Sequence, residues 1–134
     1  MAERHAKGVL DTCTYIALAS LDPEVLPKFP HITAVTMAEL HQGVVMTADP
    51  VEKSLRNEQL GAAIVEFEPL PFDGEAAARY GTMVALTIAA GRSPRPRQLD
   101  LMIAAIASTQ GLPLYTRNPE DFRGLESQVE VVEI

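Results

Sequence analysis

The hydrophobic positions along this chain follow two different periods, and each change of period marks the boundary of an expected strand or helix. Short runs that are apolar throughout, or that alternate with polar residues, predict strands at residues 7–10, 32–35, 65–70, 112–115 and 128–132. Pro69 falls inside the third run, and proline cannot donate to a sheet ladder. That strand is therefore expected at or near a sheet edge.

Longer segments with apolar residues three and four apart predict helices between these strands. They cover residues 12–21, 36–44, a long segment from residue 50, 74–90 and 99–110. Local signals support their ends: Thr36 and Glu39 have the spacing of a capping box, and Asp73 precedes the fourth helix. Gly111 follows the last of them, and Asn118 begins one further helix-start signal.

Strands that alternate with helices are typical of an α/β fold, in which helices cover both faces of a mainly parallel sheet. The predicted elements give a central sheet of four to five strands. The chain has 134 residues, of which 47% are hydrophobic and 22% charged. These values are ordinary for a globular protein, so we expect one domain over residues 1–134.

Several polar residues stand where a predicted strand ends or a predicted helix begins. Asp11 follows the first strand, Glu39 lies in the helix after the second, and Asp100 opens the helix before the fourth. Asn118 and Asp121 follow the fourth strand itself. Because the carboxyl ends of parallel strands share one edge of the sheet, we expect these residues to converge there.

Grouped carboxylates of this kind suit a hard divalent cation. Mg²⁺ takes oxygen ligands, and a cation removes the repulsion that raises the pKa of neighbouring carboxylates. A cation so held can activate water and neutralise the charge of a phosphodiester. The three histidines show no metal-ligand spacing, and the sequence contains no glycine-rich phosphate loop.

Most of these acids also have a simple local explanation. Glu39 would complete a capping box with Thr36, and Asp121 would serve the same purpose at its own helix start. Asp100 lies in a first helical turn, where the helix dipole favours an acid. Position alone does not decide between these roles and a metal site. Asp11 ends an apolar strand, where an unpaired charge is costly, so its position favours function.

The charge balance is acidic, with a net charge of −7 and a pI near 4.9, whereas nucleic-acid-binding domains are more often basic. Positive charge nevertheless gathers just before Asp100. Some residues are candidates for contacts to nucleic-acid phosphates, because they carry a positive charge or a hydroxyl next to the acids. They are Arg92, Arg95, Arg97, Arg117, Thr12 and Thr116. The arginines would equally fit a solvated loop with no partner, and the threonines would equally fit helix caps.

The sequence also carries expectations about its compartment. The segment MAERHAKGVLD is too polar for a signal peptide, and no apolar run approaches the length of a membrane span. Cys13 is the only cysteine, so there is neither an internal disulfide nor a thiolate metal site. We therefore expect a cytoplasmic protein with no membrane partner.

Four segments, taken together, resemble the PIN-domain ribonucleases, and most of all the VapC toxins of bacterial toxin–antitoxin pairs. They are VLDTCTYIAL around Asp11, TAVTMAELHQG around Glu39, LDLMIAAIA around Asp100, and LYTRNPEDF, which ends at Phe122. All four occur in family order and at family-like separations, over essentially the whole chain. The last two, D-x-x-I-A-A-x-A and T-x-N-x-x-D-F, are the more specific.

This resemblance implies a PIN-like three-layer α/β/α sandwich around a mainly parallel sheet. It implies that the catalytic residues are Asp11, Glu39, Asp100 and Asp121, and that Asp11, Glu39 and Asp100 carry Mg²⁺ or Mn²⁺. Either Asp121 or Asn118 would supply the fourth ligand position. The implied reaction is endonucleolytic cleavage of structured or single-stranded loop RNA, commonly tRNA or rRNA.

The resemblance implies partners as well. A cognate VapB-type antitoxin would inhibit the enzyme by inserting into its groove. The toxin would form a homodimer, and dimeric toxin–antitoxin pairs would bind operator DNA through the antitoxin.

Two other functions fit parts of the pattern. A receiver-like domain that accepts a phosphoryl group also places acids at strand ends, but Lys7, Lys28 and Lys53 lie far from the motif ends where it would need a lysine. A catalytically inactive PIN-fold binding or regulatory module would share the fold. The complete set of acidic residues favours an enzyme over such a module.

Overall fold

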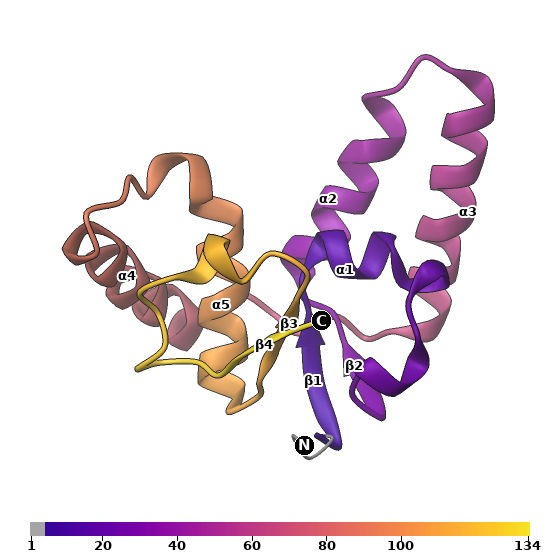
Figure 1. The fold of residues 1–134 in the computed structure, drawn as a ribbon. Coiled ribbons are helices and arrows are strands. Elements are labelled where there is room, and N and C mark those ends of the chain that lie inside the picture. Colours follow the sequence, from indigo (N-terminus) through magenta and orange to yellow (C-terminus); the bar gives the residue numbers. More distant parts are fainter. Residues whose placement is uncertain (1–4) are drawn as a thin grey trace.

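A four-stranded sheet lies at the centre of the computed structural model, which describes residues 5–134 (Figure 1). Its strands are β1 (Lys7–Leu10), β2 (Phe29–His31), β3 (Leu114–Thr116) and β4 (Val131–Glu133). Their order is β2-β1-β3-β4, and every neighbouring pair is parallel. All four carboxyl ends therefore lie along one edge of the sheet, as the alternating pattern predicted.

Helices cover both faces of this sheet. They are α1 (Thr12–Ile16), α2 (Ala34–Val45), α3 (Pro50–Glu66), α4 (Gly74–Ala89) and α5 (Gln98–Gln110), with 3-10 turns η1 (Leu18–Ser20), η2 (Pro23–Val25), η3 (Arg95–Arg97) and η4 (Pro119–Phe122). In Figure 1, α4 and α5 lie on one side and α1, α2 and α3 on the other, with the α2–α3 hairpin projecting outwards. This arrangement is the predicted three-layer sandwich. Within residues 5–134, no helix is long and apolar enough to cross a membrane.

The strand side chains divide between two hydrophobic layers, because successive residues of a strand face opposite sides of the sheet. Val9 and Leu114 pack in the layer of α5, whereas Leu10 and Tyr115 pack in the layer of α1, α2 and α3. The apolar block of α5 is buried as predicted, at Leu101, Ile103, Ala104, Ala105, Ile106 and Ala107. Packing on both faces thus holds β1 and β3 side by side at the centre of the sheet.

The second strand and the helix after it begin earlier than predicted. The strand was expected at 32–35, but β2 ends at His31 and Thr33 is already the N-cap of α2. The Thr33 hydroxyl accepts a hydrogen bond from the backbone N–H of Thr36 at 3.1 Å. The predicted capping box is therefore wrong, because Thr36 lies inside the first turn of α2. Glu39 is left free of that capping role.

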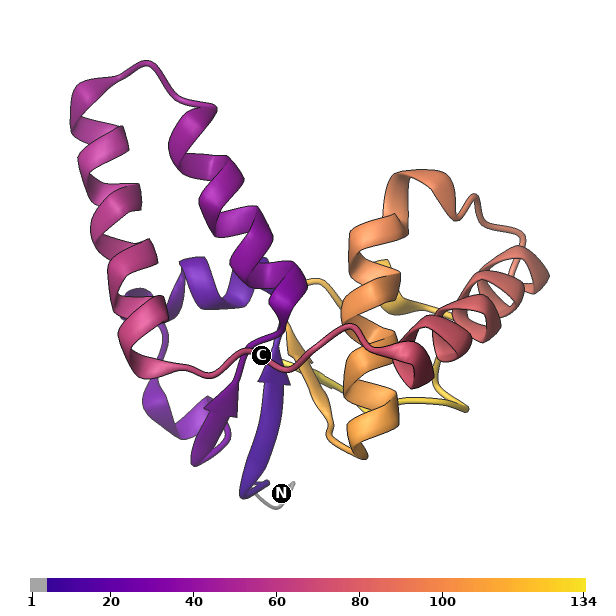
Figure 2. The same ribbon diagram turned by 180° about the vertical axis from the view of Figure 1, so that it is seen from behind.

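The strand predicted at 65–70 is not formed. Helix α3 continues to Glu66, and Leu70 makes only a single parallel bridge with Thr33. Figure 2 shows this segment crossing the sheet from α3 to α4. Val65 is 86% exposed. The alternation in the sequence therefore did not reflect a buried face.

The other elements are close to their predicted positions. Asp73 caps α4, and Gly111 ends α5 in the left-handed conformation with φ 67°. The α-helix expected over 12–21 stops at Ile16, and the helix expected from Asn118 is only the 3-10 turn η4. Strands β3 and β4 begin two and three residues later than predicted, respectively.

Gly8 allows the ring of Tyr115 to lie against β1. A Cβ at Gly8 would come within 2.6 Å of the ring atom Cε1, and Tyr115 is only 3% exposed, so the ring has little room to move. Gly8→Ala should therefore lower the free energy of unfolding by about 1–3 kcal/mol through overpacking, as measured by urea denaturation. Gly81→Ala in α4 is the control, because its Cβ would meet nothing within 4 Å. Equal effects of the two substitutions would contradict the prediction.

Candidate active site

Asp11 directly follows β1 at the carboxyl edge of the sheet and is only 4% exposed. One carboxylate oxygen accepts the backbone N–H of Thr14 at 3.0 Å and so caps α1. The other accepts the hydroxyl proton of Thr116 at 2.6 Å. These two hydrogen bonds offset part of the cost of burying a carboxylate, so Asp11 is paired although it ends an apolar strand.

Thr116 connects Asp11 to the segment that follows β3. Its hydroxyl donates to Asp11 and accepts the backbone N–H of Asn118 at 2.9 Å. The carbonyl of Asn118 in turn accepts the N–H of Asp121 at 3.0 Å. The Asn118 side chain does not cap η4. Thr116 and the backbone therefore hold the turn that carries Asn118 and Asp121.

Glu39 reaches the same region from α2. Its Oε1 accepts the hydroxyl proton of Thr12 at 2.7 Å, and the Thr12 oxygen lies 2.9 Å from the hydroxyl oxygen of Thr36. Thr12 is the residue after Asp11. The structure thus brings Glu39 next to the β1–α1 junction, where the sequence predicted that it would converge with Asp11.

Asp100 lies in the first turn of α5, and its pKa reports on the surrounding acids. Burial is the largest of the effects that raise the pKa of this carboxyl group to about 6. The charges of Asp121, Asp11 and Glu39 raise it further, in decreasing order, whereas Arg97 lowers it. All four predicted acids therefore lie close enough to interact electrostatically. Asp121 has the strongest effect on Asp100 among them.

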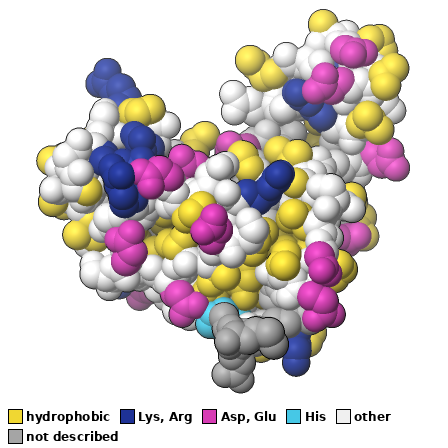
Figure 3. Space-filling model, in the orientation of Figure 1, with side chains coloured by type: hydrophobic (Ala, Val, Ile, Leu, Met, Phe, Trp, Pro, Cys, Tyr) yellow, Lys and Arg dark blue, Asp and Glu magenta, His cyan; other side chains and the backbone are white. Residues whose placement is uncertain are grey.

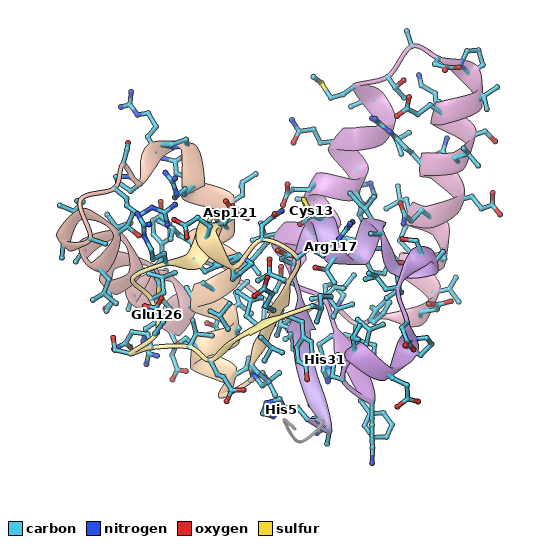
Figure 4. All side chains as sticks on the ribbon, viewed as in Figure 1. His5, Cys13, His31, Arg117, Asp121 and Glu126 are labelled. Carbon is cyan, nitrogen blue, oxygen red and sulfur yellow. The ribbon has the colours of Figure 1, made fainter. Side chains whose placement is uncertain are left out.

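Cys13 lies beside the same acids, which the sequence did not indicate. Its pKa is raised by burial first, and then by the charges of Asp11, Asp100, Glu39 and Asp121. Figure 4 shows Cys13, Arg117 and Asp121 on the same side of the molecule, beyond the carboxyl ends of the strands. The signal that could have placed Cys13 here is its position two residues after Asp11.

The donor set formed by these acids fits a hydrated divalent cation. All of the candidate ligand atoms are oxygens, as Mg²⁺ and Mn²⁺ prefer. Within residues 5–134, no three His, Cys, Asp or Glu side chains are placed so that one ion could bind all of them. Mg²⁺ usually binds one or two carboxylates directly and keeps several waters, so the separated carboxylates are compatible with it.

The predicted arginine contacts differ in their surroundings. Arg92 donates to two backbone carbonyl oxygens, those of Glu120 at 2.6 Å and Arg123 at 3.5 Å. Arg97 is the cation whose charge acts on Asp100. The space-filling view shows a hollow between the α2–α3 hairpin and the side of α4 and α5, with Lys and Arg side chains gathered on the latter side (Figure 3). Positive charge therefore flanks the acids on one side.

Glu39 also lines a groove of about 660 Å³ between α2 and α3. Leu40 and Leu55 contribute to its apolar lining, and Asp49 and Glu52 are among its polar residues. Sequence reasoning did not identify this groove, because it depends on how the two helices are paired.

Comparison with known proteins identifies the family. No protein-family model matches the chain. Ribonuclease VapC5 from Mycobacterium tuberculosis, however, is 34% identical over 139 aligned positions, which cover the whole of both chains. The chain belongs to the VapC family. The resemblance based on the four sequence segments is thereby confirmed.

Solved structures agree with this assignment. The crystal structure of VapBC-5 from Mycobacterium tuberculosis, a member of the VapBC family of toxin–antitoxin systems, matches with a TM-score of 0.84 and 34% identity over 96% of this chain and 99% of that chain. DNA-bound VapBC from Salmonella typhimurium matches with a TM-score of 0.72 and 22% identity over 95% and 97% of the two chains, which shows a shared fold. The predicted PIN-type α/β fold is confirmed.

The raised pKa of Asp100 predicts how stability depends on pH when no cation is present. The pKa of about 6 exceeds the ordinary value of 3.8, so this group favours folding below about pH 4, and the contribution is lost as the pH rises through about 6. Asp100→Asn removes the charge. In EDTA at pH 7.5 it should raise Tm by about 3 °C, which corresponds to about 1 kcal/mol for this partly exposed group.

Near pH 3 the two proteins should melt together, because this pH lies below the ordinary pKa of 3.8 and Asp100 is then mostly protonated in both the folded and the unfolded wild-type chain. Scanning calorimetry at the two pH values measures this difference. A Tm difference that is the same at pH 3 and pH 7.5 would show that the pKa of Asp100 is not raised in the folded protein.

Proposed function

We propose that this VapC-family chain is a Mg²⁺- or Mn²⁺-dependent endoribonuclease toxin. The observation that supports this most directly is the convergence of four acids at this edge: Thr116 binds Asp11, Thr12 binds Glu39, and burial first, then the charges of Asp121, Asp11 and Glu39, raise the pKa of Asp100 to about 6. Acids that repel one another at the ligand-binding edge of a parallel sheet are stabilised by a divalent cation. The name of the relative at 34% identity, a ribonuclease, supports the same reaction.

In this proposal the catalytic acids Asp11, Glu39, Asp100 and Asp121 would together hold the cation, one or two of them directly and the others through its bound waters. Asp121 is preferred to Asn118 as the fourth ligand because its carboxylate is charged and attracts a divalent cation more strongly than the neutral amide, and because its charge reaches Asp100. The cation supplies Lewis-acid stabilisation of the phosphodiester charge and lowers the pKa of water. The bonds from Thr14 and Thr116 keep the Asp11 carboxylate in a fixed orientation.

The proposed substrate is tRNA or rRNA, bound as a loop or single strand. Arg97 is the first candidate for a phosphate contact because its charge already acts on Asp100. Further candidates are Arg92, Arg95 and Arg117, of which Arg95 and Arg117 are exposed. Thr116 is a poor donor to RNA because its proton is given to Asp11.

We also infer that a VapB-type antitoxin is the partner. The matching structures come from toxin–antitoxin systems, and some of them are bound to DNA. The groove between α2 and α3 has an apolar lining, and although Glu52 is paired with Arg56 at 2.6 Å, Glu39 and Asp49 leave it with an excess of negative charge, which suits an amphipathic segment carrying basic side chains. Homodimers, operator binding through the antitoxin and a cytoplasmic site of action are inferred from the same family relationship.

Cleavage by purified, antitoxin-free protein tests the proposed activity. The wild type should cut labelled tRNA or rRNA at few sites with Mg²⁺ or Mn²⁺ and not with EDTA. Asp11→Asn and Asp100→Asn should each lower the rate at least about 100-fold, since even residues that only support metal ligands contribute about 10- to 100-fold. Asp73→Asn is the matched control, because Asp73 caps α4 and asparagine caps helices equally well.

Calorimetric titration with Mn²⁺ separates the two candidate functions. A folded wild type that binds Mn²⁺ but cuts no RNA would favour the inactive binding module. Retention of Mn²⁺ binding by both Asp11→Asn and Asp100→Asn would contradict the proposed ligand set.

A further inference from the structure

The Thr12 hydroxyl lies between two parts of the candidate active site. Its oxygen is 2.7 Å from Oε1 of Glu39 and 2.9 Å from the hydroxyl oxygen of Thr36. Thr12 is 8% exposed and Thr36 is completely buried. All three polar groups belong to this network, which joins the start of α1 to the first two turns of α2.

The chemistry of these groups fixes the direction of the hydrogen bonds. An ionised carboxylate can only accept, so the Thr12 proton is donated to Glu39. A hydroxyl has one proton, and Thr12 must therefore accept at its other contact. The Thr36 hydroxyl is then the donor to Thr12. The resulting chain runs from Thr36 through Thr12 to the Glu39 carboxylate.

These two hydrogen bonds connect residues that the fold brings together from separate elements. Thr36 and Glu39 are three residues apart on α2 and so share a helix face, while Thr12 follows Asp11 at the end of β1. A bond from Thr12 to Glu39 therefore sets the position of one acidic group relative to the segment that carries another. Because a charged acceptor makes the hydrogen bond stronger than a neutral one, the bond is suited to this task.

Glu39 needs such a restraint. Its side chain is only partly buried and also lines the groove between α2 and α3. The charge of Glu39 acts on Asp100, so repulsion between the two favours side-chain conformations that turn away from the site. The bond from Thr12 opposes that movement and reduces the number of conformations that Glu39 samples.

We propose that Thr12 is a positioning residue for Glu39, with its hydroxyl oriented by Thr36. This inference rests on the proposed metal-dependent site. It differs from the role expected from the sequence, in which Thr12 contacts RNA, because the only proton of Thr12 is already donated to Glu39.

Thr12→Val removes the hydroxyl and keeps the branched shape of the side chain. It should weaken Mn²⁺ binding, measured by calorimetry, by about 10-fold and lower the rate of RNA cleavage by about 10- to 100-fold, the usual effect of losing a group that orients a metal ligand. Thr12→Ser keeps the hydroxyl and should restore both properties. Thr36→Val should have a smaller effect in the same direction, because Thr12 can still donate to Glu39.

A double-mutant cycle identifies Glu39 as the residue through which Thr12 acts. In the Glu39→Ala background, Thr12→Val should cause no further loss of Mn²⁺ affinity. Thr87→Val is the matched control. Thr87 is a buried threonine of α4 whose hydroxyl donates to the Met83 carbonyl at 2.8 Å. Its substitution should leave Mn²⁺ affinity and cleavage unchanged.

Three outcomes would overturn the inference. A Thr12→Val protein with wild-type Mn²⁺ affinity and cleavage would show that Glu39 does not need the bond. Normal Mn²⁺ affinity and kcat with a raised KM for RNA would instead make Thr12 a substrate contact. A wild type that binds no Mn²⁺ and cuts no RNA would remove the proposed function and this inference together, whereas the first two outcomes leave the proposed function intact.

Discussion

Repulsion among four carboxylates at one edge of a parallel sheet is the constraint on which the rest of this structure depends. Asp11, Glu39, Asp100 and Asp121 come from four separate segments, and burial first, then the charges of the other three acids, raise the pKa of Asp100. Like charges brought together in a partly buried site are unfavourable unless a counter-charge or hydrogen bonds stabilise them. The site therefore exists only because packing elsewhere in the domain holds these segments together.

That packing is divided between the two hydrophobic layers. Residues of β1 and β3 point alternately into both layers, so the strands that carry Asp11 and Thr116 are fixed from two sides. Helix α5 is buried along most of its length and delivers Asp100 at its start. Hydrogen bonds from threonines then set the local geometry: Thr116 binds Asp11, and Thr12 binds Glu39. Rigid layers thus place the acids, and short polar links orient them.

The same edge provides two different surfaces for partners. On one side, arginines flank the acids and α5, which suits a polyanionic strand. On the other, Glu39 belongs both to the acidic group and to the largely apolar groove between α2 and α3. A ligand in that groove would lie against Glu39, one of the proposed catalytic acids. In the proposed function, inhibition by an antitoxin and binding of the RNA would therefore be linked through one residue, Glu39.

The sequence by itself determined the alternating α/β architecture, the buried helix α5, the caps at Asp73 and Gly111, and the set of acids, because periodicity and capping are encoded within a few neighbouring residues. It did not determine where β2 ends or that residues 65–66 are helical, since short apolar runs fit both a strand and a helix. Only the tertiary structure decided that Thr12 binds Glu39, that Cys13 lies among the acids, and that a groove begins beside Glu39. These features depend on contacts between segments that are distant in sequence. The packing of the two layers creates these contacts, and local sequence patterns do not predict them.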